Sequence, residues 1–339
     1  MKAIVVGAGV MGAATARALA WRGHDVTVFE RFAFGHDRGS SHGESRVFRF
    51  SYPDATYVAM AMEALPLWRE LEEQVGEDLL TTTGGLDRGK ALDDHVEALQ
   101  ACGAECEVLE PGEAEARFPW LGAGDGPVLF QADGGVIAAE RAVHAFLRAA
   151  AARGAVLRDE TKVLSVDPAA GGVVVETERG SLRADVAVVT AGAWAKELVA
   201  PLGVDLPTRP TRETVAYFDL DEPRLTTLVE WGDPSVYSLP SRPGVLKAGE
   251  HIAGPTTNPD EEGQANEGSV RRLSEWVARR FPTANPRPRR AETCIYTNTP
   301  DESFVLERHG DVVVGSPCSG HGFKFAPLIG KRLAALATG

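Results

Sequence analysis

The sequence has no apolar run close to the roughly 18 residues that a membrane-crossing helix requires. It does not begin with the charged region, apolar stretch and cleavage site of a secretion signal. Lys and Arg form no cluster, and the formal net charge of −13 would repel phosphate backbones. We therefore expect a cytoplasmic protein that binds neither a membrane nor a nucleic acid.

Cysteine is also scarce. The four cysteines, Cys102, Cys106, Cys294 and Cys318, have no CxxC spacing. In a reducing compartment such residues are expected to be free thiols rather than disulfides or zinc ligands. No metal site is predicted. The length of 339 residues exceeds what one core usually supports, so two domains are expected.

What is present begins with the pattern of one βαβ unit in the first thirty residues. A β-branched run at 2–6 predicts a strand, small residues over 10–21 predict a helix, and DVTVF at 25–29 predicts a second strand. Glycines fill the turn between the first strand and the helix. This context is typical of a dinucleotide site.

The turn has the sequence GAGVMG. Gly7 allows a sharp bend, Gly9 lets the backbone approach a pyrophosphate, and Gly12 lets the helix and strand pack closely. The phosphates would face amides at the helix N-terminus. Glu30 ends the second strand, where it would accept hydrogen bonds from ribose hydroxyls and disfavour a 2′-phosphate. The fingerprint alone leaves both FAD and NAD open.

The rest of the chain predicts an α/β fold with an α+β second domain. A glycine-rich polar loop spans 35–45, helices are expected over 262–280 and 326–337, and strands alternate with turns over 211–247. We expect a Rossmann-like domain and a substrate-binding domain with an antiparallel sheet. The first would comprise residues 1–85, 136–205 and 286–339, and the second residues 86–135 and 206–285.

Four segments stand in the same order as in a known family: GSSHGESRVFR at 39–49, LKAGEH at 246–251, CIYTNTPDESF at 294–304 and CSGHGFKF at 318–325. Together they resemble the monomeric sarcosine oxidase and N-methyltryptophan oxidase family, part of the D-amino acid oxidase-like flavoproteins. The resemblance covers essentially the whole chain. It implies that the Rossmann-like domain binds FAD and that the protein is a monomer.

The resemblance also implies a reaction. The enzyme would be an FAD-dependent amine oxidase that acts on a carboxylate-bearing secondary amine, either a sarcosine-like N-methyl amino acid or a cyclic imino acid. The product would be an imine, and O2 would be reduced to H2O2. Two alternatives stay open: a D-amino acid or other amine dehydrogenase that passes electrons to a non-oxygen acceptor, and a non-catalytic flavin-binding partner protein.

The resemblance gives roles to several basic residues. Arg46 would lie near the flavin ring, and Arg49 would pair with the substrate carboxylate, for which a guanidinium offers two parallel donors. Lys324 would join Arg49 at the carboxylate. Lys247 would lie over the flavin where oxygen is reduced. Lys247 stands four residues before His251, a spacing that puts both on one side of a strand or a helix.

Three other residues have expected roles that rest on the same resemblance. Cys294 stands where family members hold FAD through a thioether to the 8α-methyl group, and a thiolate suits that bond. A buried, inert thiol is the alternative, and Cys318 is the less suitable attachment point. His251 would border the substrate amine and Tyr237 would contact the substrate, although a purely structural role is equally open for both.

The catalytic candidates are therefore Arg49, Tyr237, Lys247, His251 and Lys324. The expected cofactor contacts combine the glycine turn, the loop at 35–45, the strand and turn ADVAVVTAGAW at 184–194, and the terminal loop. They are Gly7, Gly9, Gly12, Glu30, Arg31, Ser41, His42, Ser45, Arg46, Val163, Ala191, Trp194, Cys294, Gly320, His321, Gly322, Phe323 and Lys324. For Val163, a plain core position is the alternative.

Overall fold

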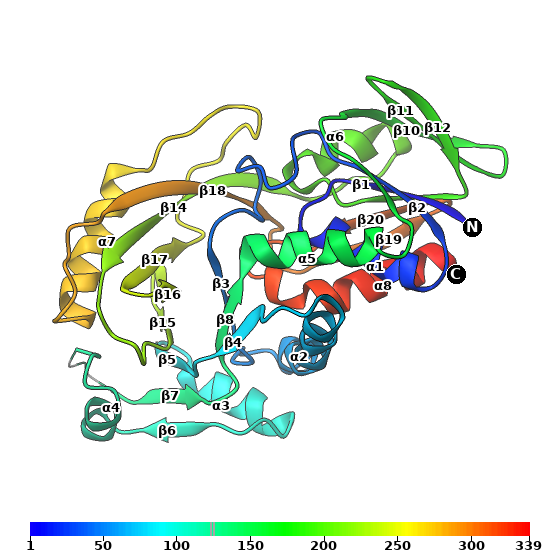
Figure 1. Ribbon diagram of the computed structural model, residues 1–339. Coiled ribbons are helices and arrows are strands. Elements are labelled where there is room, and N and C mark those ends of the chain that lie inside the picture. The colour runs from blue at the N-terminus through cyan, green and yellow to red at the C-terminus, as the bar shows by residue number, and fades with distance from the viewer. Residues whose placement is uncertain (123, 125) are drawn as a thin grey trace.

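The structure is a computed structural model that describes residues 1–122, 124 and 126–339. Two regions lie side by side, one built around a six-stranded sheet and the other around an eight-stranded sheet (Figure 1). The predicted segment 86–135 includes residues 123 and 125, which lie outside the described residues. Within the described part of the chain, no helix is long and apolar enough to cross a membrane.

The six-stranded sheet has the predicted βαβ unit at its centre. All its neighbouring strands run parallel except the edge pair β19–β20, which is antiparallel. β1 is buried along almost its whole length, as expected for a parallel strand that is covered on both faces. In hydrogen-bonded order the strands are β19 (Val305–His309), β20 (Val312–Ser316), β13 (Val186–Val189), β1 (Lys2–Val6), β2 (Asp25–Phe29) and β9 (Val156–Arg158).

Helices cover one face of this sheet. α1 consists mostly of small residues, and nearly all of them are buried against neighbouring helices. Gly330 allows one close approach, because a Cβ there would lie 2.6 Å from the Ala14 backbone. The helices of this layer are α1 (Val10–Trp21), α2 (Ala55–Val75), α5 (Ala139–Ala151) and α8 (Ala326–Thr338). The predicted helices at 10–21 and 326–337 are confirmed, the second to within one residue.

A small antiparallel sheet covers the opposite face and buries valines against β1 and β13. In Figure 1 it lies above the central sheet, with the helices below. After its last strand the chain passes through β13 of the central sheet and then forms a short helical segment. The elements are β10 (Val163–Ala169), β11 (Gly172–Thr177), β12 (Gly180–Ala184), α6 (Ala195–Val199) and the 3-10 turns Gly192–Trp194 and Ala200–Leu202.

The eight-stranded sheet forms the second region. It is antiparallel as predicted, except that β15 and β5 pair in parallel. Residues 290–298, expected in the first domain, form β18, which pairs with β14 in this sheet. The division into two domains stays a prediction. The strands in order are β18 (Arg290–Asn298), β14 (Arg209–Asp219), β17 (Val245–His251), β16 (Ser235–Arg242), β15 (Thr227–Trp231), β5 (Gly85–Gly89), β7 (Val128–Gln131) and β6 (Glu107–Leu109).

Helix α7 (Glu267–Arg280) packs on this sheet against β14 and β17. The prediction that it begins at residue 262 is wrong. Asn266 caps the helix, and its side chain accepts a hydrogen bond from the backbone nitrogen of Ser269 at 3.0 Å. The polar residues before Asn266 therefore belong to the loop between β17 and α7.

A second small sheet lies between the two regions (Figure 1). β3 (Ser45–Phe48) pairs with β8 (Gly135–Ala138), which also pairs with β4 (Leu80–Thr82). β3 follows directly on the predicted loop at 35–45 and brings it beside both large sheets (Figure 1). The remaining elements are α3 (Leu92–Ala101), α4 (Pro111–Arg117) and the 3-10 turn Phe323–Phe325.

Candidate active site

A single large cavity runs along the junction of the two regions. It is lined by the glycine turn after β1, the loop before β3, the turn after β13, strands β16, β17 and β18, and the loop between β20 and α8. Every predicted site residue except Gly12 lines this cavity. The structure thus brings together side chains that are up to 317 positions apart, from Gly7 to Lys324.

The glycine turn forms one end of the cavity. Gly7 has a φ of +95°, and a Cβ there would lie 2.7 Å from the backbone oxygen of Thr190. Gly12 is not among the residues that line the cavity, and a Cβ there would lie 1.8 Å from the oxygen of Gly7. It therefore serves helix packing, as the fingerprint predicts. The hydroxyl of Ser41 accepts a hydrogen bond from the backbone nitrogen of Val10 at 3.0 Å, so the following loop folds over the N-terminus of α1.

Glu30 lies at the end of β2 in the same part of the cavity. Its carboxylate accepts hydrogen bonds from the backbone nitrogens of Ala8 at 2.8 Å and Phe32 at 3.0 Å. Burial raises the pKa of Glu30, but hydrogen bonds from His36 and these amides outweigh burial and leave it below its ordinary value. Glu30 is therefore ionised at neutral pH. A ribose hydroxyl suits this position and a phosphate does not.

The loop between β17 and α7 closes over this end. Asp260 accepts hydrogen bonds from Arg31 at 2.5 Å and from the indole nitrogen of Trp194 at 2.8 Å. Ala191 and Val163 lie in the same wall. Val163 is also part of the core between the central and small sheets, so it is both a core position and a lining residue.

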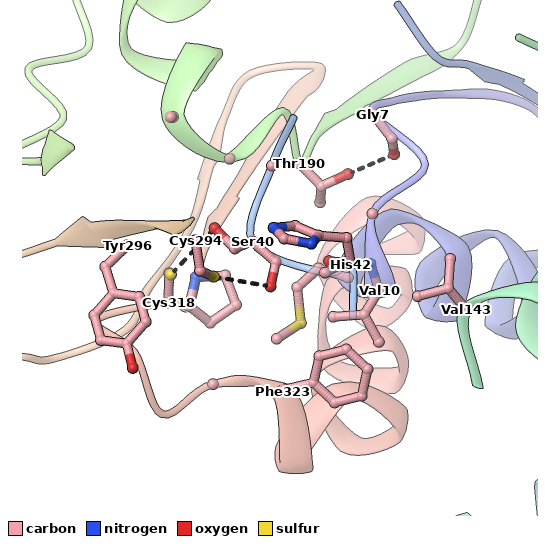
Figure 2. A pocket seen from close by; sticks show the side chains of 18 of the residues that line it. Gly7, Val10, Ser40, His42, Val143, Thr190, Cys294, Tyr296, Cys318 and Phe323 are labelled. Atoms are coloured by element: carbon pink, nitrogen blue, oxygen red, sulfur yellow. Dashed lines mark hydrogen bonds between the residues drawn. The ribbon is translucent and has the colours of Figure 1, made fainter. Parts of the chain in front are cut away.

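The loop before β3 is held by Arg46. Its guanidinium donates hydrogen bonds to the backbone oxygens of Ser40 at 2.8 Å, His42 at 2.7 Å and Ser45 at 2.9 Å. The side of the guanidinium faces Phe323, with the Arg46 Cζ atom 5.5 Å from the ring centre. Figure 2 shows His42 and Phe323 beside the same cavity. Arg46 thus fixes the loop as well as lining the middle of the cavity.

Four lining residues carry buried polar atoms with no hydrogen-bond partner among the residues that the structure describes: His42 Nε2, Ser45 Oγ, Arg49 Nη1 and Ser316 Oγ. Burial first, and then Arg46 and Lys247, lower the pKa of His42 to about 4, so its ring is neutral. Buried polar groups without a protein partner are unfavourable unless a ligand satisfies them. These atoms and the glycine turn fit a dinucleotide that carries a polar ring.

Arg49 lines another part of the cavity and contacts two aromatic rings. Its Cζ atom is 4.2 Å from the centre of the Tyr52 ring and 4.9 Å from the centre of the Trp231 six- and five-membered ring system. The Trp231 indole nitrogen donates to the buried carboxylate of Asp87 at 2.9 Å. The guanidinium is thus held in a fixed plane. Its Nη1 atom is free to bind an anion.

Lys324 comes from the loop before α8 and lies near Arg49, because both residues contact Tyr52. Its ammonium donates to the Tyr52 hydroxyl at 2.7 Å and to the backbone oxygen of His321 at 2.6 Å. Burial, followed by the charge of Arg49, holds the pKa of Lys324 well below its ordinary value. A carboxylate bound between Lys324 and Arg49 would oppose that shift. Both residues line the cavity, and their role in binding a carboxylate stays a prediction.

Lys247 and His251 lie on β17, and both line the cavity as the four-residue spacing predicts. Lys247 is buried, and its ammonium lies 3.3 Å from the backbone oxygen of Ser45. Burial first, and then Arg46, lower the pKa of Lys247 to about 7, against the opposing effects of Cys294 and Glu292. His251 Nε2 lies 3.4 Å from the carboxylate of Glu302.

Cys294 lies on β18 and is buried in the cavity wall near Ser40. Figure 2 shows it beside Cys318, and both thiols line the cavity. Burial raises the pKa of the Cys294 thiol, and the charges of Arg46 and Lys247 oppose that rise. Tyr237 comes from β16, and its hydroxyl passes over Gly249, where a Cβ would lie 2.6 Å from the oxygen. Gly249 makes room for this tyrosine.

Four residues near Arg49, Lys324 and His251 were not predicted from the sequence: Tyr52, Asp87, Trp231 and Glu302. Tyr52 follows Arg49 by three positions, which is a weak signal in a loop. Asp87 is a charged residue inside a buried strand, and such a residue signals a partner. Its position could therefore have been singled out, although its contact with Trp231 could not. Within the described part of the chain, no His, Cys, Asp or Glu side chains are grouped to hold a metal ion.

A parallel sheet whose glycine turn lines a cavity together with buried basic residues is typical of the class of dinucleotide-dependent oxidoreductases. The profile of the family described as FAD dependent oxidoreductase (DAO) matches residues 2–336. The chain therefore belongs to this family, and the expected FAD-binding Rossmann-like fold with a second region is confirmed.

Three relatives give the likeness more detail. Peroxisomal sarcosine oxidase of Homo sapiens is 35% identical over 99% of this chain and 91% of its own length. Monomeric sarcosine oxidase of Bacillus sp. (strain B-0618) is 33% identical over 98% of this chain and 91% of its own length. The structure of NikD, described as an unusual amino acid oxidase essential for nikkomycin biosynthesis, has a TM-score of 0.89, with 30% identity over 99% of this chain and 93% of that chain.

Proposed function

We propose that this FAD-dependent oxidoreductase is an amine oxidase whose substrate is a secondary amine that carries a carboxylate. An N-methyl amino acid or a cyclic imino acid has this chemistry. The substrate would be oxidised to an imine, and O2 would be reduced to H2O2. One observation carries the proposal: Arg49, with an unpartnered Nη1, and Lys324 both line the cavity and both contact Tyr52.

FAD, when bound, accepts the two electrons released by the amine and returns them to oxygen. Gly7, Gly9 and Glu30 would hold its phosphates and ribose, with Arg31, Val163, Ala191 and Trp194 around the adenosine half. Ser41, His42, Ser45 and Arg46 would lie along its ring. The amides at Gly320, His321, Gly322 and Phe323 would meet the side of the ring where negative charge accumulates on reduction.

Arg49 and Lys324 would orient the substrate by its carboxylate. The guanidinium is already held by its contacts with two rings, so little further ordering is needed when the anion binds. Binding the carboxylate would also place the neighbouring carbon and nitrogen at a fixed distance from the cations. The proposed specificity is for the amino acid end of the substrate rather than for the substituent on nitrogen.

The cavity would keep the amine of the substrate unprotonated. Arg49, Lys247 and Lys324 all disfavour a second cation nearby, which lowers the pKa of an ammonium group that enters. Tyr237 and His251 border this space and offer hydrogen-bonding groups to the nitrogen. An unprotonated amine has a lone pair to form the C=N bond of the imine, so these charges would favour the reaction.

Lys247 would serve the oxygen half of the reaction. A buried cation stabilises the negative charge that develops when oxygen receives electrons. Its contact with the Ser45 backbone oxygen holds the ammonium beside the loop expected to follow the ring. Cys294 would join FAD covalently through its sulfur. The support for this linkage is the position of the thiol in the cavity wall, near two cations that favour a thiolate.

We also propose a domain organisation and an oligomeric state for the protein. Residues 1–85, 136–205 and 286–339 would form the FAD-binding domain, and 86–135 with 206–285 the substrate domain. The protein would act as a monomer, and the similarity to monomeric sarcosine oxidase of Bacillus sp. (strain B-0618) supports this. The cytoplasmic location stays a prediction.

The test is a panel of N-methyl, cyclic and D-amino acids given to the purified FAD-containing protein. We expect anaerobic bleaching of the flavin by a carboxylate-bearing secondary amine, and one H2O2 per turnover in air. Bleaching without H2O2 would favour the dehydrogenase alternative. No bleaching by any amine of the panel would contradict the proposed activity and favour a non-catalytic flavin-binding protein.

A further inference from the structure

One aromatic residue outside the predicted site contacts both cations of the proposed anion site, Arg49 and Lys324. The ring face of Tyr52 lies 4.2 Å from the Cζ atom of Arg49. The hydroxyl of the same residue accepts a hydrogen bond from the ammonium of Lys324 at 2.7 Å. The ring and the hydroxyl therefore act on different cations. Among the described residues, Tyr52 is the side chain that links Arg49 to Lys324.

The direction of these hydrogen bonds can be derived from His321. Burial, followed by the charge of Lys324, holds the pKa of His321 well below its ordinary value, so the ring is neutral. Its Nε2 lies 3.0 Å from the backbone oxygen of Glu302, which can only accept, so Nε2 carries the proton. The bare Nδ1 then accepts from the Tyr52 hydroxyl at 3.2 Å.

This arrangement leaves the Tyr52 oxygen free to accept. Burial raises the pKa of Tyr52, so its hydroxyl stays protonated and donates to His321. Lys324 must donate to Tyr52, and it also donates to the His321 backbone oxygen. An ammonium has three donors, so one donor of Lys324 remains for an anion.

The position of Tyr52 is fixed by its neighbours. Its ring stacks on Tyr57 with centres 5.3 Å apart and lies 5.9 Å from Phe325. His321 packs on Phe304 with centres 4.8 Å apart. These rings form a buried aromatic cluster beneath the anion site, which limits the rotation of Tyr52 and His321. A residue held in this way can position others.

We propose that Tyr52 is a positioning residue of the anion site, whose ring fixes the Arg49 guanidinium and whose hydroxyl aims the third donor of the Lys324 ammonium into the cavity. This inference rests on the proposed function in one respect, that the anion is a substrate carboxylate. Tyr52 itself is not among the residues that line the cavity. It acts through the two cations.

The probe is acetate, titrated into the FAD-containing protein while the flavin absorbance is followed. Tyr52→Phe removes the hydroxyl and keeps the ring, so we expect acetate affinity to fall about tenfold, as for one lost charged hydrogen bond. Tyr57→Phe is the matched control from the same aromatic cluster and should change the affinity less than twofold. Thermal unfolding of each variant checks the fold.

A double-mutant cycle separates positioning from a general structural effect. In a Lys324→Met background, Tyr52→Phe should leave acetate affinity unchanged, because the hydroxyl has no ammonium to aim. An equal loss in both backgrounds would overturn the proposal, and so would wild-type affinity in Tyr52→Phe. Failure of the wild-type protein to bind acetate would also overturn the proposal.

The outcome is distinguishable from failure of the proposed function. If acetate binding depends on Tyr52 and Lys324 while no amine bleaches the flavin, the positioning role holds and the amine oxidase does not. If amines bleach the flavin while Tyr52→Phe binds acetate like the wild type, the oxidase holds and the positioning role is overturned. Tyr52→Leu adds a test of the ring, because it should weaken acetate binding further than Tyr52→Phe.

Discussion

The Cζ atom of Arg49 lies 4.9 Å from the centre of the Trp231 ring and 4.2 Å from the centre of the Tyr52 ring. Arg49 directly follows β3 and Trp231 ends β15, so the contact joins the small sheet of β3, β8 and β4 to the eight-stranded sheet. Trp231 is tied in turn to the buried Asp87 of the adjacent strand β5. The orientation of the proposed carboxylate anchor therefore depends on the second region of the molecule.

Replacing Trp231 should weaken substrate binding more than turnover. Trp231→Leu removes a cation–π contact of about 1 kcal/mol, so we expect KM to rise about fivefold with a smaller change in kcat. Steady-state kinetics on the amine identified by the panel measures both constants. The control is Trp21→Leu, because Trp21 also lies against an arginine, Arg153, but on the surface. A kcat loss with unchanged KM would contradict this role.

Removing the Arg49 guanidinium should be more severe. We expect Arg49→Ala to weaken the binding of carboxylate inhibitors about a hundredfold, as for the loss of one partner from a buried charge pair. Isothermal titration gives the affinity. Arg148→Ala, at an exposed arginine paired with Glu77, serves as control and should bind like the wild type. Unchanged affinity in Arg49→Ala would exclude it as the anchor.

The oxygen half-reaction should depend on pH through Lys247. Its pKa is lowered to about 7, so the ammonium is complete below that pH and is lost above it. The rate of flavin reoxidation should therefore fall as the pH rises through about 7. A negative charge on the reduced flavin would raise the pKa of Lys247 and move this fall to a higher pH.

Lys247→Met should abolish this pH dependence and slow reoxidation about a hundredfold, while flavin reduction by the amine changes much less. Stopped-flow absorbance measures the two half-reactions separately. Lys331→Met, at an exposed lysine of α8, is the control. Equal slowing of reduction and reoxidation would remove the assigned role.

The thioether predicted at Cys294 has a direct assay. After acid precipitation the protein should remain yellow, and Cys294→Ala should release the flavin into the supernatant. Cys318→Ala is the matched control, because Cys318 lines the same cavity and is expected to leave the linkage intact. Release of free flavin from the unmutated protein would show that no such bond forms.

The glycine turn should tolerate no side chain at its packing position. A Cβ at residue 12 would lie 1.8 Å from the Gly7 oxygen, so Gly12→Ala should destabilise the protein by about 1–3 kcal/mol and reduce its FAD content. Gly112→Ala is the control, because a Cβ there meets nothing within 4 Å. Thermal melting and bound-flavin absorbance report the two effects, and similar values for both variants would contradict the packing role.

The sequence predicts local features best. The strand, glycine turn and helix at the N-terminus depend on neighbouring residues, and the structure has them at the predicted positions. Lys247 and His251 lie on one face because a strand repeats every two residues. The start of α7 was misplaced because acidic and polar residues before Asn266 suit a helix as well as a loop, and only the cap decides.

Contacts between distant segments could not be predicted in this way. Arg49 contacts the ring of Tyr52 from its own loop and the ring of Trp231 from β15. The local sequence around Arg49 does not specify that Trp231, far away in the chain, will lie beside it. The parallel pairing of β15 with β5, and the place of β18 beside β14, likewise depend on how far-apart strands meet. The roles assigned to the site residues remain predictions.

Asp260 connects two parts of the chain at the adenosine end of the cavity. The loop that carries it leaves the eight-stranded sheet and meets Arg31 and Trp194, which belong to the region of the central sheet. A nucleotide bound there would be enclosed by the Asp260 loop and by the region of the central sheet. The rate at which it dissociates should therefore depend on how often this loop opens. Mature protein would then lose its prosthetic group slowly, even where no covalent bond retains it.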